Sequence, residues 1–159
     1  MDFKSLKNNN ALITGGSKGI GFGVAAEMIK AGMNVAVTSR SADAAKEAAR
    51  KLNDIGPGKA IGVKADVRKL NDQEKAVKKL VDEFGSLDVL IANAGVGKFG
   101  SIEELSVEDW NDTIETNLTG VFLSIKASLE ELKKSEGYII TISSLAGTNF
   151  FAGGSAYNA

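Results

Sequence analysis

Short apolar runs alternate with longer amphipathic stretches along almost the whole sequence. Five runs predict strands, at residues 11–13, 34–38, 60–64, 87–92 and 138–142. Apolar residues recur at helical spacing in the stretches between them, at residues 20–31, 42–52, 72–84 and 106–134. Strands separated by helices pair in parallel through right-handed crossovers, and the helices cover both faces of the sheet. We therefore predict an α/β fold with a doubly wound parallel sheet.

Glycines and capping residues mark the ends of these helices. Gly32 and Gly85 are placed as C-terminal caps, and Ser106, which precedes an acidic turn, is placed as an N-cap. Pro57 is the only proline, and the sequence contains neither a linker nor a low-complexity tract. Residues 1–159 therefore predict one domain, long enough to bury a core.

Composition excludes several classes of function. The net charge is −1, so no basic field attracts nucleic acid or anionic lipid. The chain has no cysteine and no histidine, which excludes disulfides, thiolate chemistry, histidine-based metal sites and a serine–histidine triad. Residues 1–10 lack the apolar segment of a signal peptide, and no run of 18 apolar residues follows. We expect a cytoplasmic protein without a metal or membrane partner, whose partners are small molecules or further copies of itself.

A glycine-rich turn, residues 14–21, lies between the first predicted strand and helix. Glycines there let the backbone approach a pyrophosphate at the positive end of a helix, although a plain tight turn is an alternative. The turn lacks the Gly-Lys-Ser/Thr of a Walker loop and does not follow G-x-G-x-x-G. It reads T-G-x-x-x-G-x-G.

With this spacing the sequence resembles the short-chain dehydrogenase/reductase family, which has a Rossmann-type fold. The resemblance implies that Gly15, Gly19 and Gly21 form the dinucleotide turn. It also implies that Ser17 and Ile20 make nearby contacts to the dinucleotide. We expect the family's strand order 3-2-1-4-5 for the five predicted strands.

The end of the second predicted strand indicates which nicotinamide cofactor is used. A carboxylate at this place binds the ribose of NAD, whereas a basic group accommodates the 2′-phosphate of NADP. Here the strand ends in Ser39 and Arg40, and Lys18 could add a second positive charge. We therefore predict NADP(H). Two alternatives stay open. Arg40 could be a solvated charge at the end of the strand without a ligand, or the protein could use NAD(H) as well as NADP(H).

Two further segments match the family in the expected order. The resemblance implies that Asp66 contacts the adenine ring and that Val67 lines its pocket, where an exposed helix-capping aspartate is the alternative. It also implies that Asn93, Ala94 and Gly95, after the fourth strand, brace the sheet and lie against the cofactor. A simple turn is the alternative for those three residues.

The resemblance also assigns the catalytic groups. It implies that Asn117 distorts its helix locally and holds a water in a proton relay. Ser144 would orient the substrate oxygen, and Tyr157 would act as the acid or base of hydride transfer. Tyr157 follows Ser144 by 13 residues, which matches the family. Ser143 is the alternative serine, but this interval favours Ser144.

In the family a lysine lies four positions beyond the tyrosine, which would be position 161 here. We therefore expect the 159 residues to be the N-terminal part of such an enzyme, with little turnover alone and without the family's C-terminal strands and helices. We also expect an exposed apolar edge at residues 138–142. An oligomer interface or core packing could explain Leu118, Val121, Phe122 and Ile125.

We expect an NADP-dependent oxidoreductase that acts on a carbonyl compound or secondary alcohol, nearest to the 3-oxoacyl-acyl-carrier-protein reductase and the glucose or general alcohol dehydrogenase groups. A noncatalytic dinucleotide-binding or interaction module is the alternative. A nucleotide-fold methyltransferase is disfavoured, because the turn lacks an acidic glycine motif. Phe99, Phe150 and Phe151 could line an apolar pocket or serve in packing.

Overall fold

The computed structural model describes residues 6–159 and contains one five-stranded parallel sheet. The strand order is β3-β2-β1-β4-β5, as predicted. The bounds are β1 (Asn10–Ile13), β2 (Asn34–Ser39), β3 (Ala60–Lys64), β4 (Val89–Ala92) and β5 (Tyr138–Thr141). Residues 1–5 lie outside the described residues. They are half of the stretch, residues 1–10, in which we expected no signal peptide.

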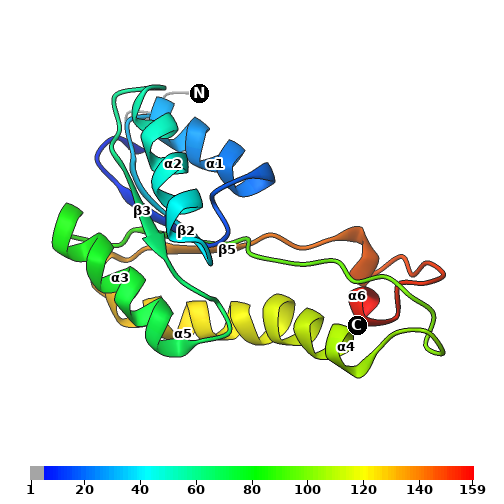
Figure 1. Ribbon diagram of the computed structural model, residues 1–159. Coiled ribbons are helices and arrows are strands. Elements are labelled where there is room, and N and C mark those ends of the chain that lie inside the picture. Colours follow the sequence, from blue (N-terminus) through cyan, green and yellow to red (C-terminus); the bar gives the residue numbers. More distant parts are fainter. Residues whose placement is uncertain (1–5) are drawn as a thin grey trace.

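Helices cover both faces of the sheet, which confirms the doubly wound arrangement (Figure 1). On one face lie α1 (Gly19–Lys30) and α2 (Ala42–Asn53). On the other lie α3 (Leu70–Phe84) and α5 (Gly120–Ser135). The remaining helical elements are α4 (Val107–Ile114), the π-helix η2 (Glu115–Thr119), the 3₁₀-helix η3 (Leu145–Gly147) and α6 (Ser155–Asn158). None of the helices within residues 6–159 is long and apolar enough to cross a membrane.

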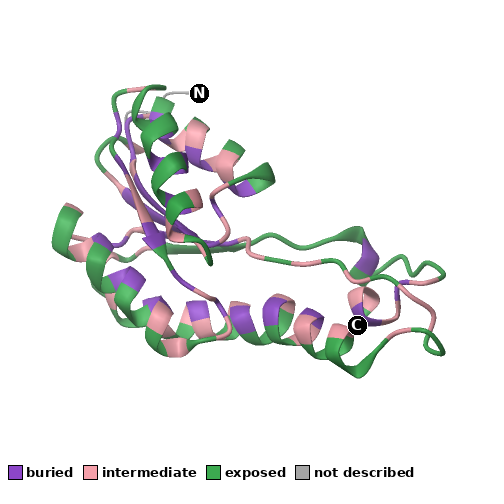
Figure 2. Ribbon diagram, viewed as in Figure 1, coloured by how far each residue is buried: buried purple, intermediate pink, exposed green. Residues whose placement is uncertain are grey.

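Alternate residues of the central strands pack into two separate hydrophobic cores, one on each face of the sheet. Ala11 and Ile13 of β1 pack on the side of α1 and α2, and Leu12 packs on the side of α3 and α5. This alternation follows from the two-residue period of a strand and favours apolar residues at successive positions of a strand buried on both faces. The buried segments in Figure 2 accordingly lie where the sheet meets its helices.

The helix ends follow the predicted signals closely. Ser106 Oγ accepts a hydrogen bond from the backbone N–H of Asp109 at 3.0 Å, which caps α4. Gly32 and Gly85 adopt φ values of +86° and +93° just after α1 and at the end of α3. These are left-handed conformations that glycine adopts without steric cost.

The β5 edge and part of the stretch from η2 to α5 are apolar and exposed. All four residues of β5 are exposed, at the edge of the sheet that we expected to be open (Figure 2). On the stretch from η2 to α5, Leu118 and Phe122 are 63% and 59% exposed, whereas Ile125 packs against the core beneath the sheet. Core packing therefore explains Ile125 and does not explain Leu118 or Phe122.

Candidate cofactor and active site

The glycine turn between β1 and α1 packs tightly against the loop that follows β4. Gly15 and Gly19 have φ values of +65° and +58°. A Cβ atom on Gly21 would lie 2.5 Å from Asn93 Nδ2, and one on Gly15 would lie 2.9 Å from Ala94 Cα. The turn therefore requires glycine for backbone conformation and for close approach.

The start of α1 is suited to an anion. Lys18 occupies the N-cap position, so α1 begins without the serine cap that α2 and α4 possess. The first backbone N–H groups of such a helix remain available to an external acceptor, and the helix dipole favours negative charge there. A glycine cradle beside a helix N-terminus fits the pyrophosphate of a dinucleotide.

Thr14 connects the glycine turn to the loop that follows β4. Its Oγ1 accepts hydrogen bonds from the backbone N–H groups of Asn93 and Ala94, at 3.0 and 3.1 Å. Asn93 Nδ2 in turn donates to the Thr14 carbonyl at 2.9 Å. We did not identify Thr14 as a site residue from the sequence, although it opens the T-G motif directly after β1. Its hydroxyl fixes the position of the β4 loop.

A cleft runs along the carboxyl ends of β1, β2, β3 and β4, where doubly wound folds bind ligands. Twelve of the thirteen predicted cofactor residues line it: Gly15, Ser17, Lys18, Gly19, Ile20, Ser39, Arg40, Asp66, Val67, Asn93, Ala94 and Gly95. Gly21 is the exception, because it is buried against Asn93. Its lack of a side chain allows the glycine turn and the loop after β4 to approach closely. The sequence did not indicate six further lining residues: Thr38, Ser41, Ala44, Ala65, Val96 and Thr116.

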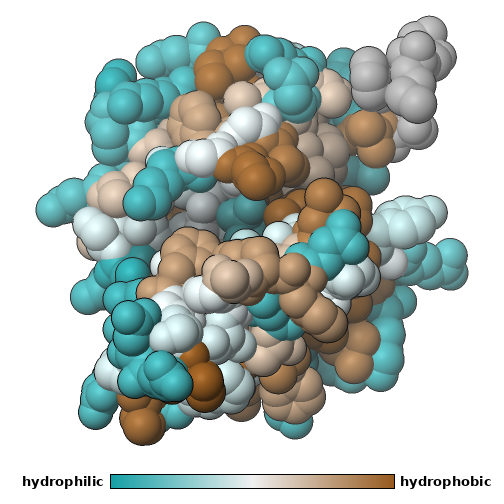
Figure 3. All heavy atoms as spheres, turned by 90° about the vertical axis from the view of Figure 1, so that its right-hand side faces the viewer, coloured by the Kyte–Doolittle hydropathy of each residue, from teal (hydrophilic) through white to brown (hydrophobic). Residues whose placement is uncertain are grey.

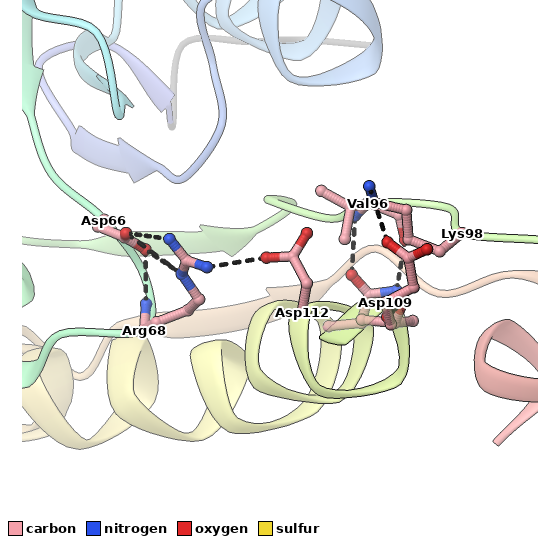
Figure 4. A network of polar contacts seen from close by, with 8 residues as sticks. Asp66, Arg68, Val96, Lys98, Asp109 and Asp112 are labelled. Atoms are coloured by element: carbon pink, nitrogen blue, oxygen red, sulfur yellow. Dashed lines mark hydrogen bonds and ion pairs between the residues drawn. The ribbon is translucent and has the colours of Figure 1, made fainter. Parts of the chain in front are cut away.

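An ion-pair network holds Asp66 in the cleft wall (Figure 4). Arg68 Nη2 lies 2.7 Å from Asp66 Oδ2, and Arg68 Nη1 lies 2.8 Å from Asp112 Oδ1 on α4. Hydrogen bonds from the Arg68 side chain are the main cause that lowers the pKa of Asp66, with a smaller contribution from the charge of Arg40. Asp66 is therefore an anion that is already paired.

The alternative that Asp66 is an exposed helix cap is wrong. Its side chain is only 14% exposed, and Lys69 occupies the N-cap position of α3. We did not identify Arg68 from the sequence; it pairs locally with Asp66 and also reaches Asp112, which is 44 residues away. The network connects the cleft wall after β3 to α4.

Asn117 lies in the π-helix η2, where the resemblance implied a local distortion. Its Oδ1 accepts from the Val96 N–H, and its Nδ2 donates to the Val96 carbonyl, both at 2.8 Å. A single amide side chain thus pairs with both backbone groups of one residue. The wider π turn directs Asn117 toward the β4 loop, where it braces the segment after Gly95.

A second hollow, of about 840 Å³, brings the three predicted catalytic residues together. Asn117, Ser144 and Tyr157 all line it, and so does the alternative serine, Ser143. Ser144 Oγ accepts a hydrogen bond from the backbone N–H of Ala146 at 3.2 Å and can still donate its proton.

The second hollow meets the cofactor cleft. Ile20, Asn93, Ala94, Gly95 and Val96 line both. The cleft and the second hollow are therefore continuous, from Arg40 past the glycine turn to Ser144 and Tyr157.

The family model described as short chain dehydrogenase matches residues 9–159. The chain is 39% identical over 154 residues to trans-4-hydroxycyclohexanecarboxylate dehydrogenase from Sinomonas cyclohexanicum, covering 94% of this chain and 60% of that protein. It is 37% identical over 150 residues to 3-oxoacyl-[acyl-carrier-protein] reductase from Synechocystis sp., covering 94% and 61%.

A solved structure is similar as well. The alcohol dehydrogenase from the archaeon Thermococcus sibiricus, complexed with 5-hydroxy-NADP, matches with a TM-score of 0.89 and 35% identity, over 94% of this chain and 63% of that one. The chain thus spans about three fifths of the length of these relatives. With a match of the family model over nearly all of its residues, the chain belongs to the short-chain dehydrogenase family.

Proposed function

We propose that the protein to which these residues belong transfers a hydride between NADP(H) and a carbonyl compound or secondary alcohol. One observation carries the proposal. A cleft that begins at Arg40 and Lys18 runs past the glycine turn and meets the hollow that holds Ser144 and Tyr157. This arrangement suits a dinucleotide whose phosphate end is recognised by cations and whose nicotinamide end faces an acid–base group.

The charges of the cleft favour NADP over NAD. Lys18, Ser39 and Arg40 offer two cations and a hydroxyl to a 2′-phosphate. Asp66 is the acidic residue that lines the cleft, and its carboxylate is occupied by Arg68. A ribose 2′-hydroxyl of NAD therefore has no unpaired carboxylate to bind among the described cleft residues. The similar archaeal alcohol dehydrogenase is complexed with a derivative of NADP.

The residues of the second hollow supply the acid–base chemistry. A bound nicotinamide supplies or accepts the hydride. In the direction of reduction, Tyr157 donates a proton to the alkoxide that develops on the substrate. Ser144 donates a hydrogen bond to the same oxygen, which stabilises the charge that appears in the transition state. Asn117 keeps in place the segment after Gly95, which lines both the cleft and the second hollow.

The similar proteins support a carbonyl or alcohol substrate without naming it. Two are named for compounds that carry a hydroxyl or an oxo group, and the third is an alcohol dehydrogenase. We propose that residues 1–159 alone bind NADP(H) with little turnover. We also propose a homo-oligomer, since Leu118 in η2 and Phe122 in α5 are exposed apolar side chains.

The experiment compares the longest protein that the gene encodes with its Tyr157→Phe variant, in assays of NADPH consumption with a panel of aldehydes and ketones. Loss of a positioned acid lowers the rate by roughly 10²–10⁴-fold, so the variant should be this much slower while its affinity for NADPH stays within about twofold. A wild-type protein that binds NADPH and reduces no carbonyl would favour the noncatalytic dinucleotide-binding module. Equal rates of wild type and variant would remove Tyr157 from the mechanism.

A further inference from the structure

The ends of β2 and β3 determine where the base of a bound dinucleotide lies. The 2′-phosphate of NADP and its adenine are attached to the same ribose, so the base lies within one sugar of the phosphate site. The Ala65 N–H, just after β3, donates to the Ser39 carbonyl at the end of β2 at 2.9 Å. A base linked to a phosphate at Arg40 is therefore expected beside Asp66 and Val67, which both line the cleft.

The walls of the cleft come from both sides of the sheet. Ala44 of α2 lines the cleft from one side, and Thr116 of η2 lines it from the other. In the view of Figure 3, which faces the end of the molecule where α4 and α6 lie, the molecule is hollowed between its upper and lower parts. Ala65 and Val67 add buried apolar side chains to the lining. The shape of such a cleft suits a flat purine, whatever polar groups the purine carries.

The acceptor sites of the Asp66 carboxylate are occupied by Arg68. Asp66 Oδ1 accepts hydrogen bonds from the Arg68 backbone N–H at 3.1 Å and from Arg68 Nε at 3.0 Å. Asp66 Oδ2 accepts from Arg68 Nη2 at 2.7 Å and from Nε at 3.2 Å. An ionised carboxylate offers about four lone-pair sites on its two oxygens, and these contacts use them. The 6-amino group of adenine, which is a donor, therefore finds no unoccupied acceptor on Asp66.

Both members of this pair are fixed from further sides. Arg68 Nη1 also lies 2.8 Å from Asp112 Oδ1 on α4, and all three side chains are less than a third exposed (Figure 4). The Asp66 carbonyl accepts from Gln73 Nε2 at 3.1 Å, and the Asp66 N–H donates to Asp72 Oδ2 at 3.0 Å. Separating the ion pair would leave two partly buried charges with fewer partners, which is unfavourable. A ligand therefore gains access to the carboxylate only by displacing Arg68.

From these contacts we propose that Arg68 is a positioning residue that withholds the Asp66 carboxylate from the cofactor, so that Asp66 does not select a base by its 6-amino group. The purine is held at this place by the shape of the cleft, and the 2′-phosphate beside Arg40 and Lys18 supplies the charged contacts. The inference rests on the proposed function, because it takes NADP(H) as the ligand of the cleft. It states which groups at the adenosine end of that ligand are recognised.

The test compares two ligands that differ only in the amino group, adenosine 2′,5′-bisphosphate and purine riboside 2′,5′-bisphosphate. Calorimetric titration of the longest encoded protein gives a Kd for each, and the ratio of the two measures the contribution of the amino group. Asp66→Ala should leave this ratio within about twofold of its wild-type value, because the carboxylate is withheld in the wild type. If Asp66→Ala lowers the preference for adenosine by about tenfold or more, the amino group displaces Arg68 and the inference is wrong.

Arg68→Met tests the positioning role itself. Without Arg68 the carboxylate becomes an acceptor for the amino group, so the preference for adenosine should rise about tenfold, and adding Asp66→Ala should return it to the wild-type value. Lys69→Met is the matched control, because it removes the neighbouring exposed charge and leaves the pair of Asp66 with Arg68 in place. If Arg68→Met weakens both ligands by the same factor, Arg68 serves the fold alone. The comparison with Asp66→Ala decides the inference even if Arg68→Met does not fold.

These measurements separate failure of this inference from failure of the proposed function. Neither bisphosphate contains nicotinamide, so the ratios do not depend on hydride transfer. The expected ratios in a protein that reduces no carbonyl would support the inference and refute the proposed reaction alone. A large fall of the preference in Asp66→Ala would refute the inference alone. Failure of both bisphosphates to bind would refute the phosphate site of the proposed function, and the inference with it.

Discussion

Replacing Arg40 with Gln should change cofactor selectivity without weakening the fold. Arg40 is exposed and lines the cleft at the end of β2, and no ion pair involves its guanidinium among residues 6–159. Its removal should therefore leave the free energy of unfolding unchanged within about 0.5 kcal/mol, as is usual for surface positions. Its effect should be confined to a ligand that carries a phosphate at this place.

The magnitude follows from the contact that is lost. A hydrogen bond to a charged group contributes about 1.5–3 kcal/mol, and every 1.4 kcal/mol is tenfold in affinity. Because Arg40 is exposed, solvent screens its charge, and Lys18 remains in the same cleft, so the low end of that range applies. We expect the Kd for NADPH to rise about tenfold and the Kd for NADH to stay within about twofold.

Both dissociation constants can be measured by titrating the fluorescence of the reduced cofactors at low and high salt. Raising the ionic strength should reduce the difference between wild type and Arg40→Gln, since salt screens exposed charges. Arg50→Gln on α2 is the matched control, because it removes the same charge outside the cleft. If Arg40→Gln raises the Kd for NADPH and for NADH equally, or raises neither, Arg40 does not bind the 2′-phosphate and the NADP assignment loses its main support.

Four further substitutions test the framework of the site. Gly21→Ala places a Cβ 2.5 Å from Asn93 Nδ2 and should weaken NADPH binding about tenfold or more. The control Gly23→Ala has open space around it and should stabilise α1 by about 0.5–1 kcal/mol. Equal NADPH binding by the two variants would show that the glycine turn tolerates a side chain at residue 21. Thr14→Val leaves the N–H groups of Asn93 and Ala94 without their acceptor and should lower the free energy of unfolding by about 1–3 kcal/mol in urea denaturation, and a change below about 0.5 kcal/mol would contradict the role of Thr14. The folded-state pKa of Asp66 lies below its ordinary 3.8, so its pairing with Arg68 stabilises the fold above that pH and is lost as the pH falls through the lowered value. The difference in unfolding free energy between wild type and Arg68→Met should therefore shrink from about pH 5 to about pH 2, and a difference independent of pH would exclude this linkage.

Much of the fold could be predicted because the central strands β1, β2 and β4 are buried on both faces. Such strands are short, mostly apolar runs, and the one predicted at residues 34–38 falls within the observed β2. The predicted ends of strands and helices were less accurate than their existence. Leu87 is fully buried but precedes β4, and α3 begins at Leu70, two residues before its predicted start. Burial alone does not distinguish a paired strand residue from a buried loop residue.

Most of the cofactor cleft could be predicted because parallel strands bring their carboxyl ends to one edge. Contacts between distant segments could not be predicted. Gly21 must lack a side chain because Asn93 lies against it, and Arg68 links Asp66 to Asp112 on α4. The place of Phe99 beside Tyr157 likewise depends on hydrogen bonds between two loops. None of these pairs has a local pattern in the sequence.

A crystal structure of the protein with NADP⁺ tests the central claim most directly. We predict the 2′-phosphate beside Arg40 and Lys18, the pyrophosphate at the N-terminus of α1, and the nicotinamide ring in the hollow with Ser144 and Tyr157. The 2′-phosphate in solvent away from Arg40 would contradict the NADP assignment. A nicotinamide outside that hollow would contradict the proposed route of hydride transfer.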